Sequence, residues 1–150
     1  MLNDAFSEVY MKCKLHFYQK AFERLKEREA SLTTVETFCM EIIYALGKPT
    51  VAEFSRVANI SSPNAAYKIT NLVQKGYIRK VRSDVDKREC YLEVTDKYLE
   101  YYNISNSYLT EVMERMEKRF TKEELKFVER VLEVMSEELM PEVDLSHRRD

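Results

Sequence analysis

Two groups of polar and charged side chains in the middle of the chain have the types and spacing that binding to a polyanion requires. The first is the segment SDVDKREC, in which Asp86 stands directly before Lys87 and Arg88. The second recurs at spacings of three and four residues and consists of Asn64, Lys68, Asn71 and Lys75. Lysine and arginine attract phosphate, and an asparagine amide offers adenine both a donor and an acceptor. The chemistry that these residues predict is recognition of nucleic acid.

The distribution of charge supports this interpretation, although the net charge of the whole chain is -2. Residues 48–88 hold nine basic and three acidic side chains, a net charge of +6, so the remainder carries -8. A local field of this kind, rather than the total charge, governs the encounter with phosphate. A solvated charged surface is the alternative explanation.

The elements that would position these side chains are helices with clear end signals. Apolar residues from Phe6 to Leu25 recur at helical spacing and predict a long helix over residues 2–29. Capping boxes, in which threonine precedes glutamate by three residues, predict helices after Thr33, Thr50 and Thr121. A helix is also expected between a Ser62 cap, with Pro63 at its first position, and Gly76.

Two adjacent predicted helices, 51–58 and 63–75, form a helix-turn-helix pattern. In the second of them we expect Ala66, Ile69, Leu72 and Val73 to face the core, with the Asn64 stripe facing outward. The strand-like runs YIRKVR and CYLEVT follow, so the charged segment between them predicts the tip of a hairpin wing. There Arg88 would enter the minor groove, Lys87 would contact phosphate and Asp86 would hold an arginine in place.

The chain resembles the MarR family, the multiple antibiotic resistance regulators of bacteria. The matching segments are VAEFSRVANISSPNAAYKITNLVQKGYI, DKR at Asp86 to Arg88, and LEVT. The chain departs from the family pattern at Tyr67, where the family often has Arg or Lys, and at Tyr98, where it often has Gly. The resemblance implies a homodimeric transcription factor that binds double-stranded DNA, commonly a repressor on a pseudo-palindrome and often released by a small molecule or by thiol oxidation.

With this resemblance, the predicted fold is mainly α with a small β-hairpin wing (α+β). The chain, 1–150, is expected to form a single domain with a winged helix-turn-helix lobe at 33–95 and a helical dimerisation lobe at 1–30 and 96–145. The predicted DNA contacts of the recognition helix are Ser62, Asn64, Ala65, Tyr67, Lys68, Asn71 and Lys75. Those of the wing are Arg82, Asp86, Lys87 and Arg88.

Apolar stripes on the end helices lie outside the core of the winged helix and predict a dimer interface. The helix that begins near Asp96 ends near Phe120, and the last helix carries apolar residues at alternating spacings of three and four. An intramolecular bundle is the alternative. The predicted interface comprises Phe6, Val9, Phe17, Leu125, Val128, Leu132, Met135 and Leu139.

Two modes of regulation remain open at this stage. Cys13 lies in the first helix, where the peroxide-sensing branch of the family keeps a reactive cysteine, but it falls on the apolar stripe, where cysteine usually acts as a small hydrophobe. Tyrosines could instead line a pocket for an aromatic or phenolic effector, or simply pack in the core. These tyrosines are Tyr10, Tyr18, Tyr44, Tyr98, Tyr101, Tyr102 and Tyr108.

Other classes of protein receive little support from the composition. Three cysteines at wide spacings and two distant histidines, His16 and His147, do not favour a metal centre, and no cofactor is expected. Two glycines supply no phosphate-binding loop, and no nucleophile stands near a base, so we do not expect an enzyme. No apolar run is long enough to span a membrane, which favours a cytoplasmic location. A winged helix that binds only other proteins is the remaining alternative.

Overall fold

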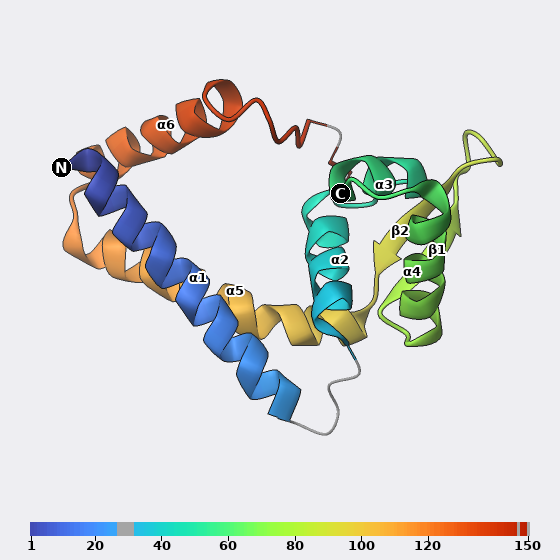
Figure 1. Ribbon diagram of the computed structural model, residues 1–150. Coiled ribbons are helices and arrows are strands. Elements are labelled where there is room, and N and C mark those ends of the chain that lie inside the picture. Colours follow the sequence, from blue (N-terminus) through green and yellow to red (C-terminus); the bar gives the residue numbers. More distant parts are fainter. Residues whose placement is uncertain (27–31, 147, 150) are drawn as a thin grey trace. The chain divides into compact units, whose positions relative to one another are not determined.

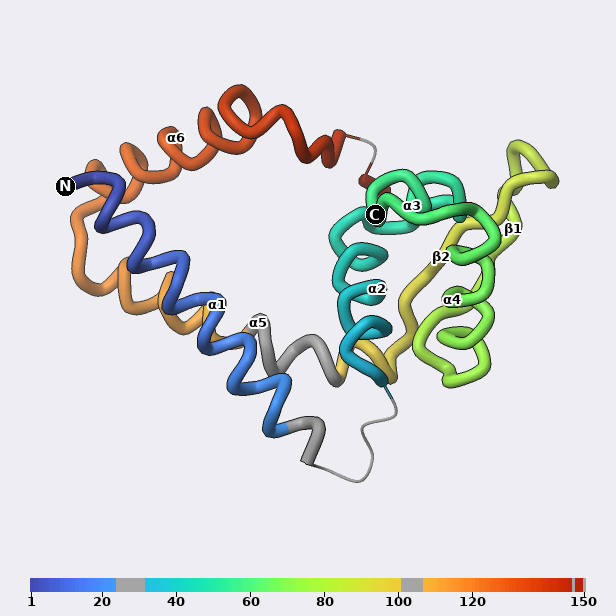
Figure 2. Tube along the Cα trace, viewed as in Figure 1, coloured from blue at the N-terminus to red at the C-terminus, as the bar shows by residue number. Residues whose placement is uncertain are grey.

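The computed structural model describes residues 1–26, 32–146 and 148–149, with the backbone alone for 24–26 and 101–106 (Figures 1 and 2). Within these residues the regular structure consists of helices and one antiparallel hairpin, which confirms the predicted fold class. The elements are α1 (Leu2–Lys26), α2 (Thr34–Ala45), α3 (Val51–Ala58), α4 (Ser62–Gln74), β1 (Ile78–Arg82), β2 (Cys90–Val94), α5 (Asp96–Arg119) and α6 (Lys122–Glu138).

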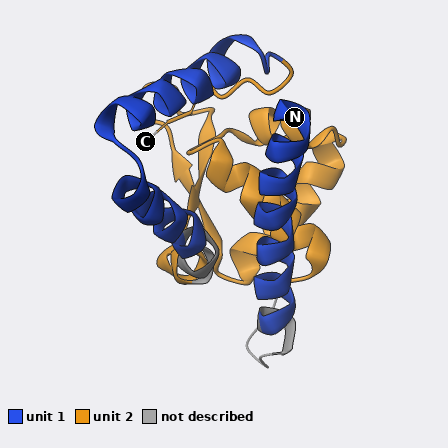
Figure 3. Ribbon diagram, turned by 90° about the vertical axis from the view of Figure 1, so that its left-hand side faces the viewer, with its two compact units in different colours: residues 1–30, 101–141 blue, residues 31–100, 142–150 orange. Residues whose placement is uncertain are grey.

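The chain divides into two compact units (Figure 3). One unit comprises residues 1–30 and 101–141, which include α1 and α6. The other comprises residues 31–100 and 142–150 and contains α2, α3, α4 and the hairpin. Residues 96–100 and 142–145 were expected in the helical lobe, yet they group with the winged helix, so the segment after α6 returns to that unit.

Side-chain caps fix the helix ends. All three predicted capping boxes form, at Thr33, Thr50 and Thr121. The predicted cap of α4 was wrong by one residue: Ser61 accepts the N–H of Asn64 at 3.4 Å, so Ser62 is the first helical residue. Asp96 is the first residue of α5, close to the predicted start of that helix.

The core of the second unit lies between the three short helices and the hairpin. Its fully buried side chains come from each of these elements and include Met40, Ile43, Phe54, Ile69, Leu72, Ile78 and Leu92; Tyr98, in the first turn of α5, joins them. Burying one side chain of this size stabilises a fold by about 1.5–3 kcal/mol. On β2 only Leu92 is fully buried, while Cys90 and Val94 are half-buried. The Leu92 N–H also donates to the Pro49 carbonyl at 2.8 Å, which joins the hairpin to the loop between α2 and α3.

The buried face of α2 does not consist of all its apolar residues. Val35 and Phe38 on this helix are 51% and 50% exposed. Glu36 and Thr37 are buried in their place, because Glu36 closes the capping box and pairs with a lysine of α4. The sequence pattern did not show this pairing, since it joins residues that are far apart in the chain.

The helices of the first unit leave large apolar side chains exposed. Among the described residues, all fully buried apolar side chains lie between Leu32 and Tyr98, and α6 has none. Phe6 and Val9 on α1 are 50% and 61% exposed, as are Phe127 and Leu132 on α6 at 61% and 51%. These stripes therefore lack the covering that apolar surface on a stable helix normally has.

Candidate nucleic-acid interface

A tight turn sets the geometry of α3 and α4. Asn59 adopts a left-handed conformation with φ of 52° and ends α3, while the Ser55 hydroxyl donates to the Ile60 carbonyl at 2.7 Å. The Ser61 cap and Pro63 then start α4 directly. This short helix, turn and capped helix form a helix-turn-helix, in which the second helix is the element that enters a major groove.

The buried stripe of α4 differs by one position from the prediction. Ala65, Ile69 and Leu72 are completely buried and follow one another at helical spacing. Ala65 was predicted to contact DNA, but its side chain is fully buried and does not reach the surface of the helix. Ala66 and Val73 were expected in the core but are exposed, because the start of the helix at Ser62 places Ala65 on the core-facing side.

Several predicted contacts on α4 lie on its solvent-facing side. Ser62 and Asn64 are exposed in the first turn, and Tyr67 is 67% exposed. Lys68 and Asn71 are half-buried and flank this surface. Thr70, which the sequence reading did not include, is also exposed, and its hydroxyl donates to the Ala66 carbonyl at 2.8 Å. A helix that starts at Ser62 places Thr70 on the solvent-facing side, so the correct start would have identified this residue.

Lys75 has a structural partner instead of a free ammonium. Its Nζ lies 2.6 Å from Oε2 of Glu36, and both side chains are largely shielded from solvent. Burial raises the pKa of the Glu36 carboxyl, but hydrogen bonds from Lys75 and from the Thr33 N–H outweigh it and hold the pKa below its ordinary value. The Lys75 charge thus ties the end of α4 to α2, which does not favour the predicted contact with DNA.

The loop between β1 and β2 is a compact turn organised by Ser83. The Ser83 N–H donates to the Glu89 carbonyl at 3.0 Å, and its hydroxyl accepts the N–H groups of Val85 and Asp86 at 3.2 Å. Asp86 Oδ1 accepts the backbone N–H of Arg88 at 3.0 Å. Asp86 was predicted to hold an arginine side chain; it instead shapes the turn through the backbone.

The wing carries exposed cations, on β1 and in this turn. Among the residues that the structure describes, Lys80, Arg82, Lys87 and Arg88 are exposed and form no ion pair. Arg79 is different, since its Nε lies 3.0 Å from Oε2 of Glu93 and this hydrogen bond raises the arginine pKa. Lys80 was not among the predicted contacts; it stands two residues before Arg82, so the alternation of the strand could have identified it. Unpaired cations at the end of a hairpin are suited to phosphate and to a narrow minor groove.

Fold and site together define a winged helix-turn-helix with a cationic wing. The family model described as the MarR family matches residues 32–90. The segment that carries the helix-turn-helix and most of the wing therefore belongs to the MarR family of winged-helix transcription regulators, as the sequence resemblance predicted.

Solved structures show the same fold. A mutant of MepR from multidrug-resistant S. aureus is 16% identical with a TM-score of 0.65, and the match covers 93% of this chain and 98% of that chain. The regulator Tm0710 from Thermotoga maritima is 17% identical with a TM-score of 0.63 over 90% and 94%. FabT of Streptococcus pneumoniae, solved in complex with DNA, is 20% identical with a TM-score of 0.60 over 92% and 94%. No curated protein matches the sequence.

The residues considered for regulation lie in different surroundings. Cys13 is half-buried on α1, and burial raises the pKa of the Cys39 thiol, so Cys39 does not favour the reactive thiolate. Tyr98 is fully buried, and its hydroxyl donates to Oε1 of Glu41 at 3.0 Å. The Tyr108 ring stacks on His16 at 3.8 Å in the other unit. Tyr101 and Tyr102 lie outside the residues whose side chains are described.

Two further properties bear on the class of protein. In the described part of the chain, three or more His, Cys, Asp or Glu side chains nowhere gather in a way that could hold a metal ion. None of the described helices has a stretch long and apolar enough to cross a membrane.

Proposed function

We propose that this protein is a sequence-specific regulator of transcription that binds double-stranded DNA as a homodimer. The observation that carries the proposal is the unpaired cationic wing tip beside a capped helix with exposed polar residues, in a segment of the MarR family. FabT, a protein of the same fold, has been solved in complex with DNA, which supports binding to the same kind of partner.

In this proposal α4 reads the major groove and the wing contacts the minor groove. Asn64 and Asn71 would hydrogen-bond to base edges, while Tyr67 offers an apolar surface and a hydroxyl. Lys87 would contact phosphate, and the Arg88 guanidinium would enter a narrow minor groove, where the negative potential is concentrated. Phosphate contacts would set the register, and the α4 contacts would supply the sequence preference.

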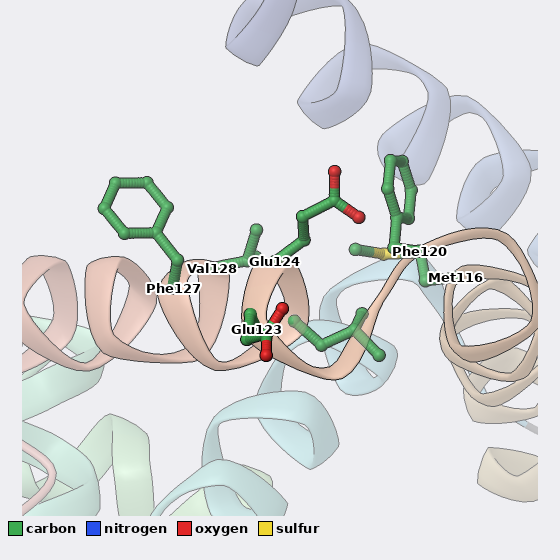
Figure 4. Close-up of a pocket in the computed structure, with 7 residues that line it drawn as sticks. Met116, Phe120, Glu123, Glu124, Phe127 and Val128 are labelled. Atoms are coloured by element: carbon green, nitrogen blue, oxygen red, sulfur yellow. The ribbon is translucent and has the colours of Figure 1, made fainter.

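The proposed homodimer rests on the apolar stripes of the first unit. A groove of about 480 Å³ is lined by residues of α1 and α6, including Phe6, Phe127, Val128, Leu132 and Met135. A hollow of about 440 Å³ lies at the corner between α5 and α6, where Phe120, Glu124 and Phe127 point the same way (Figure 4). A second copy related by a two-fold axis would cover such surfaces on both chains.

A two-fold dimer would bind a pseudo-palindrome whose half-site centres lie about one helical turn apart. Occupancy of such an operator would repress transcription, and a small aromatic or phenolic molecule would release the protein. These two statements rest on the family resemblance. Redox regulation through Cys13 is a second candidate: the thiol is only half-buried, so an oxidant could reach it.

Selection of genomic fragments by the purified protein tests the proposal. We expect the retained fragments to share a pseudo-palindrome, and Asn71→Ala to lower affinity for it by about 1–3 kcal/mol while leaving random duplex nearly unaffected. Equal losses on both DNAs would place Asn71 on the backbone. Retention of no fragments by a folded, dimeric protein would favour a winged helix that binds proteins only.

A further inference from the structure

The segment that follows α6 makes specific contacts with the winged helix. Residues 142–150 share one compact unit with α2, α3, α4 and the hairpin (Figure 3). The Arg149 guanidinium donates to Glu53 twice, from Nη1 to Oε2 at 2.8 Å and from Nη2 to Oε1 at 2.9 Å. Nη1 also donates to the Lys48 carbonyl at 3.2 Å, and the guanidinium carbon lies 4.8 Å from the centroid of the Tyr91 ring. One side chain therefore contacts the α2–α3 loop, α3 and β2.

The path of the segment is itself held by local bonds. The Ser146 N–H donates to Asp144 Oδ1 at 2.8 Å, and the Arg148 N–H donates to the Leu145 carbonyl at 3.0 Å. The segment forms one wall of a hollow of about 470 Å³, whose other wall consists of Leu46, Glu53, Arg56 and Val57. We call residues 142–146 and 148–149 the strap.

The loop between α2 and α3 has the shape that the strap requires. Gly47 has φ of +76°, and a Cβ at this position would clash with the backbone carbonyl oxygen of Arg149 and lie 2.9 Å from the Arg149 nitrogen. Backbone atoms cannot move aside as a flexible side chain would. Gly76 has a similar φ of +81°, but a Cβ there would meet only Lys97 at 3.9 Å. An alanine at either glycine would strain the backbone, but only an alanine at Gly47 would also displace the strap. A comparison of the two substitutions therefore distinguishes the two effects.

Glu53 connects the strap to the helix-turn-helix. Its Oε2 accepts the Thr50 N–H at 3.4 Å in the capping box of α3 and also accepts Arg149. The hydrogen bonds from Arg149 outweigh burial and hold the pKa of the Glu53 carboxyl below its ordinary value. The strap thus contacts the first turn of α3, beside the point where the hairpin joins the loop through Leu92 and Pro49.

We propose that Arg149 is a positioning residue for DNA binding, through which the strap fixes the wing relative to the helix-turn-helix. The inference rests on the proposed function. Simultaneous contact with two grooves requires a fixed spacing between α4 and Arg88, and this spacing depends on the junction between β2 and the loop before α3. Arg149 braces that junction by contacting both Tyr91 and Glu53. Such pre-organisation raises affinity without a direct contact to the ligand.

Amide hydrogen exchange in the full chain tests the brace without DNA. In Arg149→Ala, the Leu92 amide, bonded to Pro49, should exchange several-fold faster, whereas the Tyr77 amide, bonded to the Leu72 carbonyl at 3.0 Å, should not change. Arg149→Lys should restore part of the protection. Unchanged exchange at Leu92 would overturn the proposal.

Two matched pairs of variants control for effects on the fold. Glu53→Gln keeps a side chain that can close the capping box but loses the ion pair, so it should resemble Arg149→Ala. Glu124→Gln makes the same change in the capping box of α6, which belongs to the other unit, and should resemble the parent. Gly47→Ala should speed exchange at Leu92, and Gly76→Ala should not. If the two variants of either pair changed the exchange of the Leu92 amide equally, the proposed role of the strap would be contradicted.

Duplex binding supplies the second arm. Arg149→Ala should weaken affinity about three- to tenfold while the dependence of log K on log[salt] keeps its slope, because Arg149 is not a phosphate contact. A slope lower by about one unit per subunit would make Arg149 a DNA contact and overturn the positioning role. If the parent binds no duplex, the proposed function and the positioning role both fail, while the exchange measurement still decides whether the strap braces Leu92.

Discussion

Replacing Arg88 with alanine should weaken DNA binding while leaving the fold intact. The side chain lies in the exposed turn of the wing and forms no ion pair among the described residues. Its backbone N–H donates to Asp86 Oδ1, a bond that alanine retains. Surface substitutions of this kind usually change the free energy of unfolding by less than about 0.5 kcal/mol. A loss of DNA affinity in Arg88→Ala would therefore reflect a lost contact with DNA and not unfolding of the protein.

The expected loss follows from the proposed place of the guanidinium in the minor groove. Removal of one cationic contact to the duplex should lower the slope of log K against log[salt] by about one unit per wing. Arg88→Lys should recover only part of the affinity, because it keeps the charge and loses the planar set of donors. Arg130→Ala removes one exposed positive charge from α6 and is the matched control, which should leave the slope unchanged.

The assay is fluorescence anisotropy of a labelled duplex at several salt concentrations, with thermal unfolding measured in parallel. Asp86→Asn keeps an oxygen for the Arg88 N–H and should bind nearly as the parent does, whereas Asp86→Ala loses this bond and should weaken binding mildly. If Arg88→Ala binds like the parent while it stays folded and dimeric, the wing does not contact DNA and the protein-binding alternative gains support.

Three more outcomes are expected. Lys75→Ala should lower the free energy of unfolding by about 1 kcal/mol and leave the salt slope unchanged. The pKa of the Glu36 carboxyl is lowered in the folded protein, so the difference in stability between parent and variant should be complete above the ordinary carboxyl pKa. It should shrink as the pH falls through the lowered pKa, which urea unfolding at several pH values measures. A difference that does not change with pH would contradict the ion pair. Phe127→Asp should produce monomers in light scattering, and an unchanged dimer would remove α6 from the interface. Burial raises the pKa of the Glu41 carboxyl, so its ionised form lowers the free energy of unfolding at a pH above the raised pKa. Glu41→Gln still accepts the Tyr98 hydroxyl, so the variant should be more stable than the parent at pH 7 and equally stable at acidic pH. A variant that is less stable at pH 7 would contradict this.

Local signals in the sequence predicted the elements of the fold well. A capping box depends on residues three apart, and a left-handed residue at a helix end needs only its own neighbours, so the helices after Thr33, Thr50 and Thr121 could be predicted. The hairpin also followed from alternation. Consecutive serines offered two caps for α4, and the spacing of the core residues did not decide between them.

The errors at the site come from contacts between distant parts of the chain. A shift of one residue at the start of α4 exchanges Ala65 and Ala66 between the core and the surface, because each helical residue turns by about 100°. The partners Lys75 and Glu36 are 39 residues apart, and Arg149 and Glu53 are 96 apart. Nothing in the local pattern distinguishes a lysine that pairs with a carboxylate from one that contacts phosphate.

The most direct test of the central claim is the affinity of the parent protein for its selected duplex and for a scrambled duplex across a range of salt concentrations. The account predicts that the selected duplex binds at least about 10³ times more tightly and that both affinities fall steeply as salt increases. Equal, weak binding to both duplexes with no dependence on salt, by a protein that is folded and dimeric, would contradict it.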